Sequence, residues 1–206
     1  MNTIIVTGTD TGIGKTVFSA GLTRALQATY WKPVQAGLDE ATDSEIVAHL
    51  SGQPVLPEAY RLELPASPHL SAQVEGVEID PSRLTPPRIE GPLVIEGAGG
   101  LMVPLSRRHL FLDVIADWRA PVVLVARTRL GTINHSLLSL AALKNRGCTV
   151  AGVAFVGEDM ADSRSIITEM GGVRDLGRLP FLPDLTPDSL ADAFSAIDLN
   201  AIRETL

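Results

Sequence analysis

The feature that most constrains this chain is a glycine-rich loop between an apolar segment and a helix-compatible one. The segment Asn2–Val6 leads into Thr7–Thr16 (TGTDTGIGKT), which is followed by VFSAGLTRALQ. A strand, a glycine-rich turn and a helix N-terminus form an anion site, because free backbone N–H groups point at phosphate oxygens. In such loops the lysine reaches the β- and γ-phosphates and the threonine hydroxyl suits Mg²⁺. The context predicts a nucleotide phosphate site.

One glycine of this loop departs from the usual spacing. Counted back from Gly14-Lys15-Thr16, the first glycine is expected at Thr9, whereas this chain has Gly8. Gly12 keeps the loop permissive for positive φ. A scaffold with a degenerate phosphate loop is the plain alternative, and the intact GKT sequence counts against it.

Composition narrows the class of protein further. The 206 residues suit one domain, 1–206, and 45% hydrophobic with only 4% aromatic residues indicates a core of Val, Ile, Leu and Ala, typical of helix-covered parallel sheets. A net charge of −7 without a long basic cluster argues against nucleic acid and anionic lipid as partners. No apolar run approaches the ~20 residues of a membrane span, so we expect a cytoplasmic protein. Cys148 is alone, and we interpret it as a buried, inert thiol.

Apolar segments alternate with helix-compatible ones along the chain. The expected strands are Ile4–Thr7, Tyr30–Val34, Pro92–Glu96, Pro121–Ala126, Val150–Val156 and Leu176–Leu179. Pro33 interrupts the second of them, so the end of that strand is expected at the rim of the sheet. The expected helices are Gly14–Gln27, Asp43–Leu50, Leu110–Trp118, Thr132–Asn145, Ser163–Met170 and Ser189–Ile197, with loops and one or two short helices between residues 52 and 91. This alternation predicts an α/β fold with a doubly wound, mostly parallel sheet flanked by helices.

In such sheets ligands bind beyond the carboxyl ends of the strands. That rule brings together the loop Gly8–Thr16, Lys32, Glu96 with the glycines after it, and the loop Arg127–Gly131. We therefore expect one shared rim to carry the chemistry.

Three charged side chains of this rim are candidates. Glu96 ends an apolar strand beside the phosphate loop, where it either serves Mg²⁺ or simply precedes a tight turn, and the loop favours the metal interpretation. Lys32 can neutralise a phosphoryl group or an anionic substrate, or else reach water from the end of its strand. Asp43 is either a helix cap or a second carboxylate beside the metal and Thr16, and the residues alone leave both open.

A second anion site is expected where the segment Leu130–His135 opens the next helix. Thr132 is a candidate cap, and the free N–H groups of the first turn suit a carboxylate. The alternative is a well-capped helix without a ligand. We interpret His135 as structural, and the other histidines show no metal-ligand spacing.

Five stretches stand in a specific order: Thr7–Thr16 (TGTDTGIGKT), Lys32–Gly37 (KPVQAG), Ser67–Ala72 (SPHLSA), Glu96–Gly100 (EGAGG) and Leu130–His135 (LGTINH). Together they resemble the dethiobiotin synthetase family, and they span most of the chain. The resemblance implies a P-loop nucleoside triphosphate hydrolase-like fold and an ATP- and Mg²⁺-dependent cyclo-ligase of biotin biosynthesis. Such an enzyme closes the ureido ring of dethiobiotin from 7,8-diaminononanoate and CO₂ or bicarbonate, and releases ADP and phosphate.

The resemblance also implies roles for residues. Lys32 and Lys15 would be catalytic, and Thr16, Asp43 and Glu96 would serve the metal. The residues implied in nucleotide binding are Gly12, Ile13, Gly14, Lys15, Thr16, Val17, Asp43, Glu96, Gly97, Ala98, Gly99, Pro180, Phe181 and Leu182. Those implied in substrate binding are Thr11, Lys32, Ala36, Leu130, Gly131, Thr132, Ile133 and Asn134. In the family the last five are offered by a second subunit, so a homodimer with the substrate site at its interface is implied.

Two positions depart from the family pattern. Ala36 stands where relatives often carry a Ser or Thr that contacts the substrate. After the strand Val150–Val156 many relatives have an asparagine that reads the adenine edge, whereas this chain has Phe155-Val156-Gly157-Glu158. We therefore expect backbone groups and Pro180–Leu182 to select the base, and a loose preference for ATP.

Other protein classes share this kind of loop. A cobyrinate amidase-ligase usually carries a glutaminase domain with a cysteine nucleophile, for which this chain is too short. A partner-regulated ATPase switch of the chromosome-partitioning type carries a lysine early in the loop, where this chain has Asp10, and the guanine-reading N-K-x-D motif is absent. The switch is the alternative to the ligase.

Overall fold

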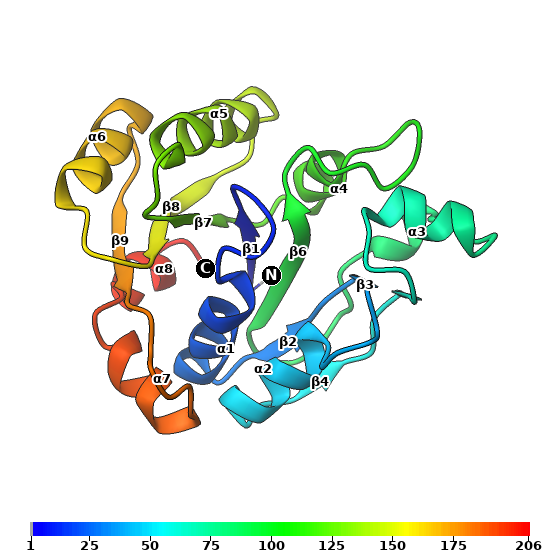
Figure 1. Ribbon diagram of the computed structural model, residues 1–206, viewed down its shortest axis with the longest axis horizontal. Coiled ribbons are helices and arrows are strands. Elements are labelled where there is room, and N and C mark those ends of the chain that lie inside the picture. The colour runs from blue at the N-terminus through cyan, green and yellow to red at the C-terminus, as the bar shows by residue number, and fades with distance from the viewer. Residues whose placement is uncertain (1) are drawn as a thin grey trace.

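Helices cover both faces of one parallel sheet (Figure 1) in a computed structural model that describes residues 2–206. Over these residues the sheet has seven strands in the order β4-β2-β6-β1-β7-β8-β9, and every pairing in it is parallel. The strands are β1 (Thr3–Gly8), β2 (Thr29–Trp31), β4 (Val55–Leu56), β6 (Leu93–Gly100), β7 (Val122–Arg127), β8 (Val150–Val156) and β9 (Asp175–Leu179). The predicted fold class, a doubly wound parallel α/β sheet, is confirmed.

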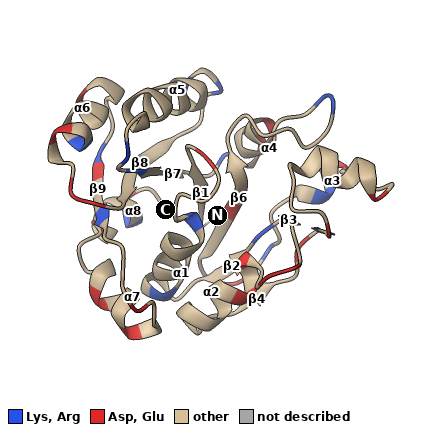
Figure 2. Ribbon diagram, in the orientation of Figure 1, with Lys and Arg blue, Asp and Glu red and all other residues tan. Residues whose placement is uncertain are grey.

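The helices follow the strands in alternation. They are α1 (Lys15–Leu26), α2 (Asp43–Ser51), α3 (Pro68–Val74), α4 (Phe111–Trp118), α5 (Thr132–Asn145), α6 (Ala161–Gly171), α7 (Pro187–Phe194) and α8 (Leu199–Arg203), with a 3₁₀ turn at Pro81–Leu84. In residues 2–206 no helix combines the length and apolar character that crossing a bilayer requires. Figure 2 shows Lys and Arg dispersed over several elements rather than gathered on one.

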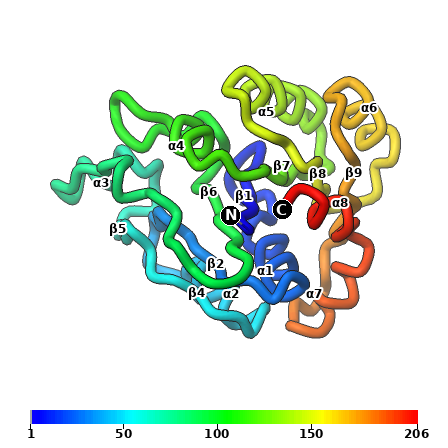
Figure 3. Tube along the Cα trace, turned by 180° about the vertical axis from the view of Figure 1, so that it is seen from behind, coloured from blue at the N-terminus to red at the C-terminus, as the bar shows by residue number. Residues whose placement is uncertain are grey.

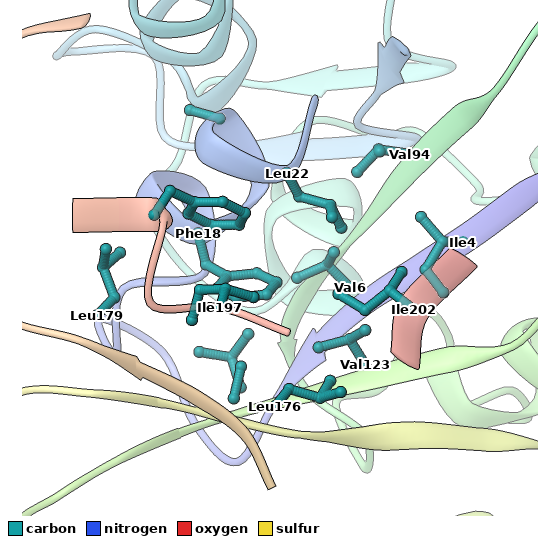
Figure 4. Close-up of a cluster of buried hydrophobic side chains, with 14 of the residues drawn as sticks. Ile4, Val6, Phe18, Leu22, Val94, Val123, Leu176, Leu179, Ile197 and Ile202 are labelled. Atoms are coloured by element: carbon teal, nitrogen blue, oxygen red, sulfur yellow. The ribbon is translucent and has the colours of Figure 1, made fainter. Parts of the chain in front are cut away.

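The core lies on the two faces of the sheet. One face packs against α1, α2, α7 and α8, where the rings of Phe18 in α1 and Phe194 in α7 meet at an angle of 50° with centroids 5.2 Å apart. Figure 4 shows Phe18 and Leu22 over Val6 and Val123 of the central strands. The other face packs against α4, α5 and α6. Seen from behind (Figure 3), α8 lies beside β8 and β9, with which it is in contact.

The expected strand Tyr30–Val34 is wrong as a single element. The chain forms β2 up to Trp31 and then leaves the main sheet, and β3 (Val34–Ala36) pairs instead with β5 (Tyr60–Leu62) in a separate two-stranded sheet. Pro33 lies between them and has no N–H to continue the first ladder, while its carbonyl accepts from the N–H groups of residues 59 and 60. The chain therefore changes sheet at Pro33.

Strand β6 runs on past its expected end at Glu96, as far as Gly100. Its pairing with β1 shifts register after Glu96 and resumes at Gly100, which lies beside Gly8. A Cβ at Gly100 would lie 3.4 Å from the Thr9 carbonyl oxygen, so glycine suits this close approach of two backbones. The glycines after Glu96 belong to the strand rather than to a turn.

The helix caps settle two open predictions. Thr42 caps α2 in a capping box with Glu45, which leaves the carboxylate of Asp43 free for another role. Thr132 does not cap α5: Gly131 occupies that position at φ 93°, a conformation that glycine adopts without strain. The Thr132 hydroxyl, already inside the helix, donates back to the Arg127 carbonyl.

Candidate functional site

The loop between β1 and α1 lies at the carboxyl ends of the central strands. Gly12 and Gly14 adopt φ of 66° and 95°, and a Cβ at Gly14 would meet Val156 Cγ1 at 2.8 Å, so the loop needs glycine there. The N–H groups at the start of α1 face this loop without an acidic side chain in the first turn. Lys15 is buried, and its Nζ donates to the Asp10 carbonyl at 2.7 Å. This is the geometry of an anion-binding helix start.

A buried cluster of charges adjoins the loop. Lys32, 4% exposed, places Nζ 2.7 Å from Asp43 Oδ2 and 3.1 Å from Glu96 Oε1. Its Nζ also donates to the Gly97 carbonyl at 3.2 Å. Thr16 Oγ1 donates to Asp43 Oδ1 at 2.5 Å and lies 3.3 Å from Glu96 Oε1. The structure therefore brings together four of the predicted site residues from three elements and the segment after β2.

The pKa values in this cluster reflect burial and mutual charge. Burial opposes the charge on Lys32, but the facing Glu96 and Asp43 outweigh it, so the pKa of Lys32 is raised above 10.5. Burial lowers the pKa of Lys15 to about 8, with Glu96 opposing this effect and Lys32 adding to it. Burial disfavours the Asp43 anion, yet Lys32 and the Thr16 hydroxyl hold the pKa of Asp43 below its usual value. The Lys32 ammonium and the Asp43 carboxylate thus stabilise each other in their charged forms.

The same cluster fits a hard divalent cation. Thr16, Asp43 and Glu96 direct oxygen atoms to one place, and oxygen is the ligand that Mg²⁺ prefers. In residues 2–206 no group of three or more His, Cys, Asp and Glu side chains is arranged to hold a metal. Mg²⁺ commonly uses one or two carboxylates together with substrate phosphates and water, which is what this donor set allows.

A cavity of about 330 Å³ lies next to the loop. Gly12, Ile13, Gly14 and Val17 form one side, and the predicted Pro180–Leu182 segment forms another. The walls are largely apolar, including Val156 and Leu179. Arg127 and Arg129 also line the cavity. From the sequence they were expected only as part of a loop at the rim. Their position in a loop that follows a strand could have marked them as candidate site residues.

A second cavity, of about 440 Å³, lies on the other side of the charge cluster. Three of the residues predicted to bind the substrate, Thr11, Lys32 and Ala36, line it. Asp43, Ala98 and Gly99 line it too. Further walls come from Gln35, Val103 and the segment Pro65–Pro68. From the sequence no site role was predicted for Gln35, Val103 or Pro65–Pro68. Ser67 does begin SPHLSA, one of the five stretches that resemble the family.

The remaining predicted substrate residues lie elsewhere on the chain. No residue of Leu130–Asn134 lines either cavity, and the Leu130 side chain is fully exposed. Cys148 is half-buried rather than buried, and burial raises the pKa of its thiol. It lies on the wall of a separate groove between α5 and α6, away from the cluster.

Comparison with known proteins shows the family to which the chain belongs. A family model described as an AAA domain matches residues 2–189. The chain is 61% identical over 194 residues to the ATP-dependent dethiobiotin synthetase BioD of Agrobacterium fabrum, covering 93% of this chain and 92% of that protein. It is 63% identical to the protein of the same name from Brucella anthropi, with the same coverage, and 58% identical to that of Sphingopyxis alaskensis, covering 95% and 96%. The chain belongs to the dethiobiotin synthetase family.

Solved structures agree on the fold of this dethiobiotin synthetase family member. The cell division ATPase MinD of Pyrococcus furiosus matches all of both chains with a TM-score of 0.63 at 16% identity. A ParA family ATPase from Chlorobium tepidum matches 100% of this chain and 97% of its own, with a TM-score of 0.54 at 12% identity. At these identities the likeness shows a shared P-loop fold and nothing about activity.

Proposed function

We propose that this chain is an ATP- and Mg²⁺-dependent ligase that closes the ureido ring of dethiobiotin from 7,8-diaminononanoate and CO₂. The names of its relatives support this activity. The observation that carries it is the position of Lys32. This lysine lines the second cavity and also contacts Asp43 and Glu96, which approach the phosphate loop through Thr16. One cation therefore joins a nucleotide site to a substrate site.

The first step needs cationic surroundings. One amine of the diamine forms an N–C bond to CO₂ and loses a proton, which leaves a negatively charged carbamate. Lys32 would stabilise that charge, since the raised pKa keeps its ammonium protonated at neutral pH. The positive charge would also favour the neutral, nucleophilic form of the amine before attack.

The second step is phosphoryl transfer, and the loop would position it. A carbamate oxygen forms a bond to the γ-phosphorus, and the bond to the ADP oxygen breaks. Lys15 would offset charge on the phosphate oxygens, and Thr16, Asp43 and Glu96 would hold Mg²⁺, which spreads the same charge when it is bound. Since no general base of unusual pKa stands out among residues 2–206, we expect positioning and electrostatics to provide most of the rate.

The third step closes the ring. The second amine attacks the carbonyl carbon of the mixed anhydride, the C–O bond to phosphate breaks, and the amine proton is lost. A carbamic-phosphoric anhydride hydrolyses easily, so the apolar side chains of Ala36, Ala98 and Val103 in the second cavity would serve to exclude water. Ala36 offers no hydroxyl to the substrate, and we expect backbone groups or water to make that contact.

We further propose that the substrate carboxylate binds at the start of α5 of a second copy of the chain. The first-turn N–H groups of this helix follow Gly131, and no acidic side chain lies in that turn. The segment Leu130–Asn134 lines no cavity of its own chain, and Leu130 is fully exposed. Both observations favour a homodimer in which each copy completes the site of the other.

The cavity beside Pro180–Leu182 is proposed to hold the nucleoside. Its walls carry no Asn, Gln, Asp or Glu side chain to read a base edge. The Gly157 N–H already donates to the Leu179 carbonyl at 3.0 Å, and the Gly157 carbonyl accepts from Arg178 at 2.8 Å. We therefore expect triphosphates other than ATP to serve as well.

A steady-state assay tests the ligase against a nucleotide switch. Purified protein with MgATP and bicarbonate is expected to release phosphate only when 7,8-diaminononanoate is added. The matched control is the monoamine that lacks the 8-amino group: it can form a carbamate but cannot close a ring, so it is expected to give no cyclic urea, and any phosphate released with it would come from hydrolysis of the anhydride. Hydrolysis at the full rate without diamine would instead favour a partner-regulated switch.

A further inference from the structure

Tyr30 makes a contact that no step of the proposed reaction uses. This side chain is fully buried on β2, and its hydroxyl lies 3.0 Å from Glu96 Oε2. The other oxygen of the same carboxylate, Oε1, faces Lys32 Nζ at 3.1 Å and Thr16 Oγ1 at 3.3 Å. The two oxygens of Glu96 therefore have separate partners, one in the core and one in the site.

The arrangement follows from strand geometry. Tyr30 pairs with Val94 of the neighbouring strand β6, and Glu96 lies two residues further along on the same face. Lys32 is likewise two residues beyond Tyr30. The Tyr30 ring thus approaches Glu96 from the interior of the sheet, while Lys32 approaches the same carboxylate from the rim.

We propose that Tyr30 is a positioning residue that fixes the Glu96 carboxylate, so that Oε1 alone is presented to the divalent cation and to Lys32. The inference rests on the proposed function, because Glu96 is there a metal ligand. A ligating carboxylate whose second oxygen accepts a hydrogen bond keeps one orientation, and such outer partners matter nearly as much as the ligands themselves.

The surroundings of the hydroxyl support a donor role. The Tyr30 hydroxyl is the donor in this contact, because an ionised carboxylate such as Glu96 can only accept a hydrogen bond. The ring lies in the core beside α1 and α2, where the packing limits its rotation. The carboxylate itself is 1% exposed, so no bulk water replaces this hydrogen bond if it is lost.

The test is Tyr30→Phe, which removes the hydroxyl and keeps the ring. Mn²⁺ binding is measured by the loss of the free-ion EPR signal, with a non-hydrolysable ATP analogue bound and no diamine present. Loss of such an outer hydrogen bond is expected to weaken Mn²⁺ binding by about tenfold. Since this readout needs no diamine, it stands apart from the failure or success of the ligase assay.

A matched control comes from the other tyrosine of the chain. Tyr60 is also buried, and its hydroxyl accepts from the Asp80 N–H at 2.9 Å, away from the cluster. Tyr60→Phe is expected to leave Mn²⁺ affinity unchanged. Unchanged affinity in Tyr30→Phe, or an equal loss in both variants, would overturn the proposal.

A double-mutant cycle asks whether Tyr30 acts through Glu96. In a Glu96→Gln background, which already lacks the metal-binding charge, Tyr30→Phe is expected to cause little further loss of Mn²⁺ affinity. Two independent, additive losses would show a general effect on the core and would contradict the assigned role.

A measurement on the wild-type sequence covers the case in which Tyr30→Phe does not fold. The chain has two tyrosines, so protein labelled with 3-fluorotyrosine gives two ¹⁹F resonances, which Tyr60→Phe assigns. Adding Mg²⁺ to the complex with the ATP analogue is expected to shift the Tyr30 resonance and leave that of Tyr60 in place. An unmoved Tyr30 resonance would refute the coupling to the cation.

Discussion

Replacing Lys32 with methionine tests the charge cluster most sharply. Methionine is unbranched and of similar length, so Lys32→Met removes the ammonium with little change in packing. Asp43 and Glu96 are then left facing each other without the cation that lies 2.7 and 3.1 Å from them. Each carboxylate loses its ion-pair partner, and Glu96 is almost completely buried.

The expected loss of stability can be worked out from these contacts. Removing one partner of a buried ion pair costs about 3–5 kcal/mol. The side chain of Asp43 remains 25% exposed, so water screens part of the repulsion and the lower end, about 3 kcal/mol, applies. For a chain of this length 1 kcal/mol corresponds to about 2–4 °C in Tm, which predicts a fall of about 6–12 °C.

The assay is thermal unfolding without metal or nucleotide, followed by the same scan with Mg²⁺ and an ATP analogue. The second scan is expected to recover part of the loss, because a divalent cation neutralises the two carboxylates. Lys144→Met, at an exposed position of α5, is the matched control and should change Tm by less than about 2 °C. Phosphate release should fall about 10²–10³-fold in Lys32→Met while nucleotide binding remains measurable. A change in Tm as small as that of the control would refute the cluster as described.

Three further predictions concern the nucleotide. The pKa of Lys15 in the free protein is about 8, so its ammonium loses a proton above that pH. ATP affinity should therefore decline above pH 8, and ATP binding there should take up a proton. A calorimetric binding profile that stays flat from pH 7 to 9.5 would contradict this. In the wild type we expect kcat/KM for ATP to lie within about tenfold of that for GTP and CTP, because no Asn, Gln, Asp or Glu side chain lines the cavity. Val156→Asn should raise this preference for ATP, and a wild-type enzyme already strict for ATP would show that the base is read another way. Gly14→Ala places a Cβ 2.8 Å from Val156 Cγ1, on a residue whose own φ is 95°. It should therefore weaken ATP binding at least tenfold, and unaltered affinity would argue against this loop geometry.

The main part of the site could be predicted because it depends on strand ends. In a parallel sheet the carboxyl ends of neighbouring strands meet at one rim, so the sequence predicts that the phosphate loop, Lys32 and Glu96 lie together. Asp43 was left open between a cap and a ligand. The structure decides that Thr42 is the cap, since its capping box with Glu45 leaves Asp43 free to face Lys32.

The parts that escaped prediction depend on pairings distant in the sequence. Nothing local to Tyr30 indicates that β2 lies beside β6, and only that register places its hydroxyl on Glu96. The break at Pro33 was expected, but the pairing of β3 with β5 beyond it and the very short strands β4 and β5 are set by tertiary partners rather than by periodicity. Thr132 was mistaken for a cap because sequence alone cannot show that Gly131 takes the left-handed conformation.

The most direct test of the central claim follows the oxygen of CO₂. If a carbamate oxygen beside Lys32 attacks the γ-phosphorus, a brief reaction with C¹⁸O₂ in unlabelled water should place one ¹⁸O in each phosphate released, read by mass spectrometry, and leave the other ¹⁸O in the ureido carbonyl of the product. Phosphate free of label would mean that water attacks the nucleotide, and the proposed joining of the two cavities through Lys32 would be wrong.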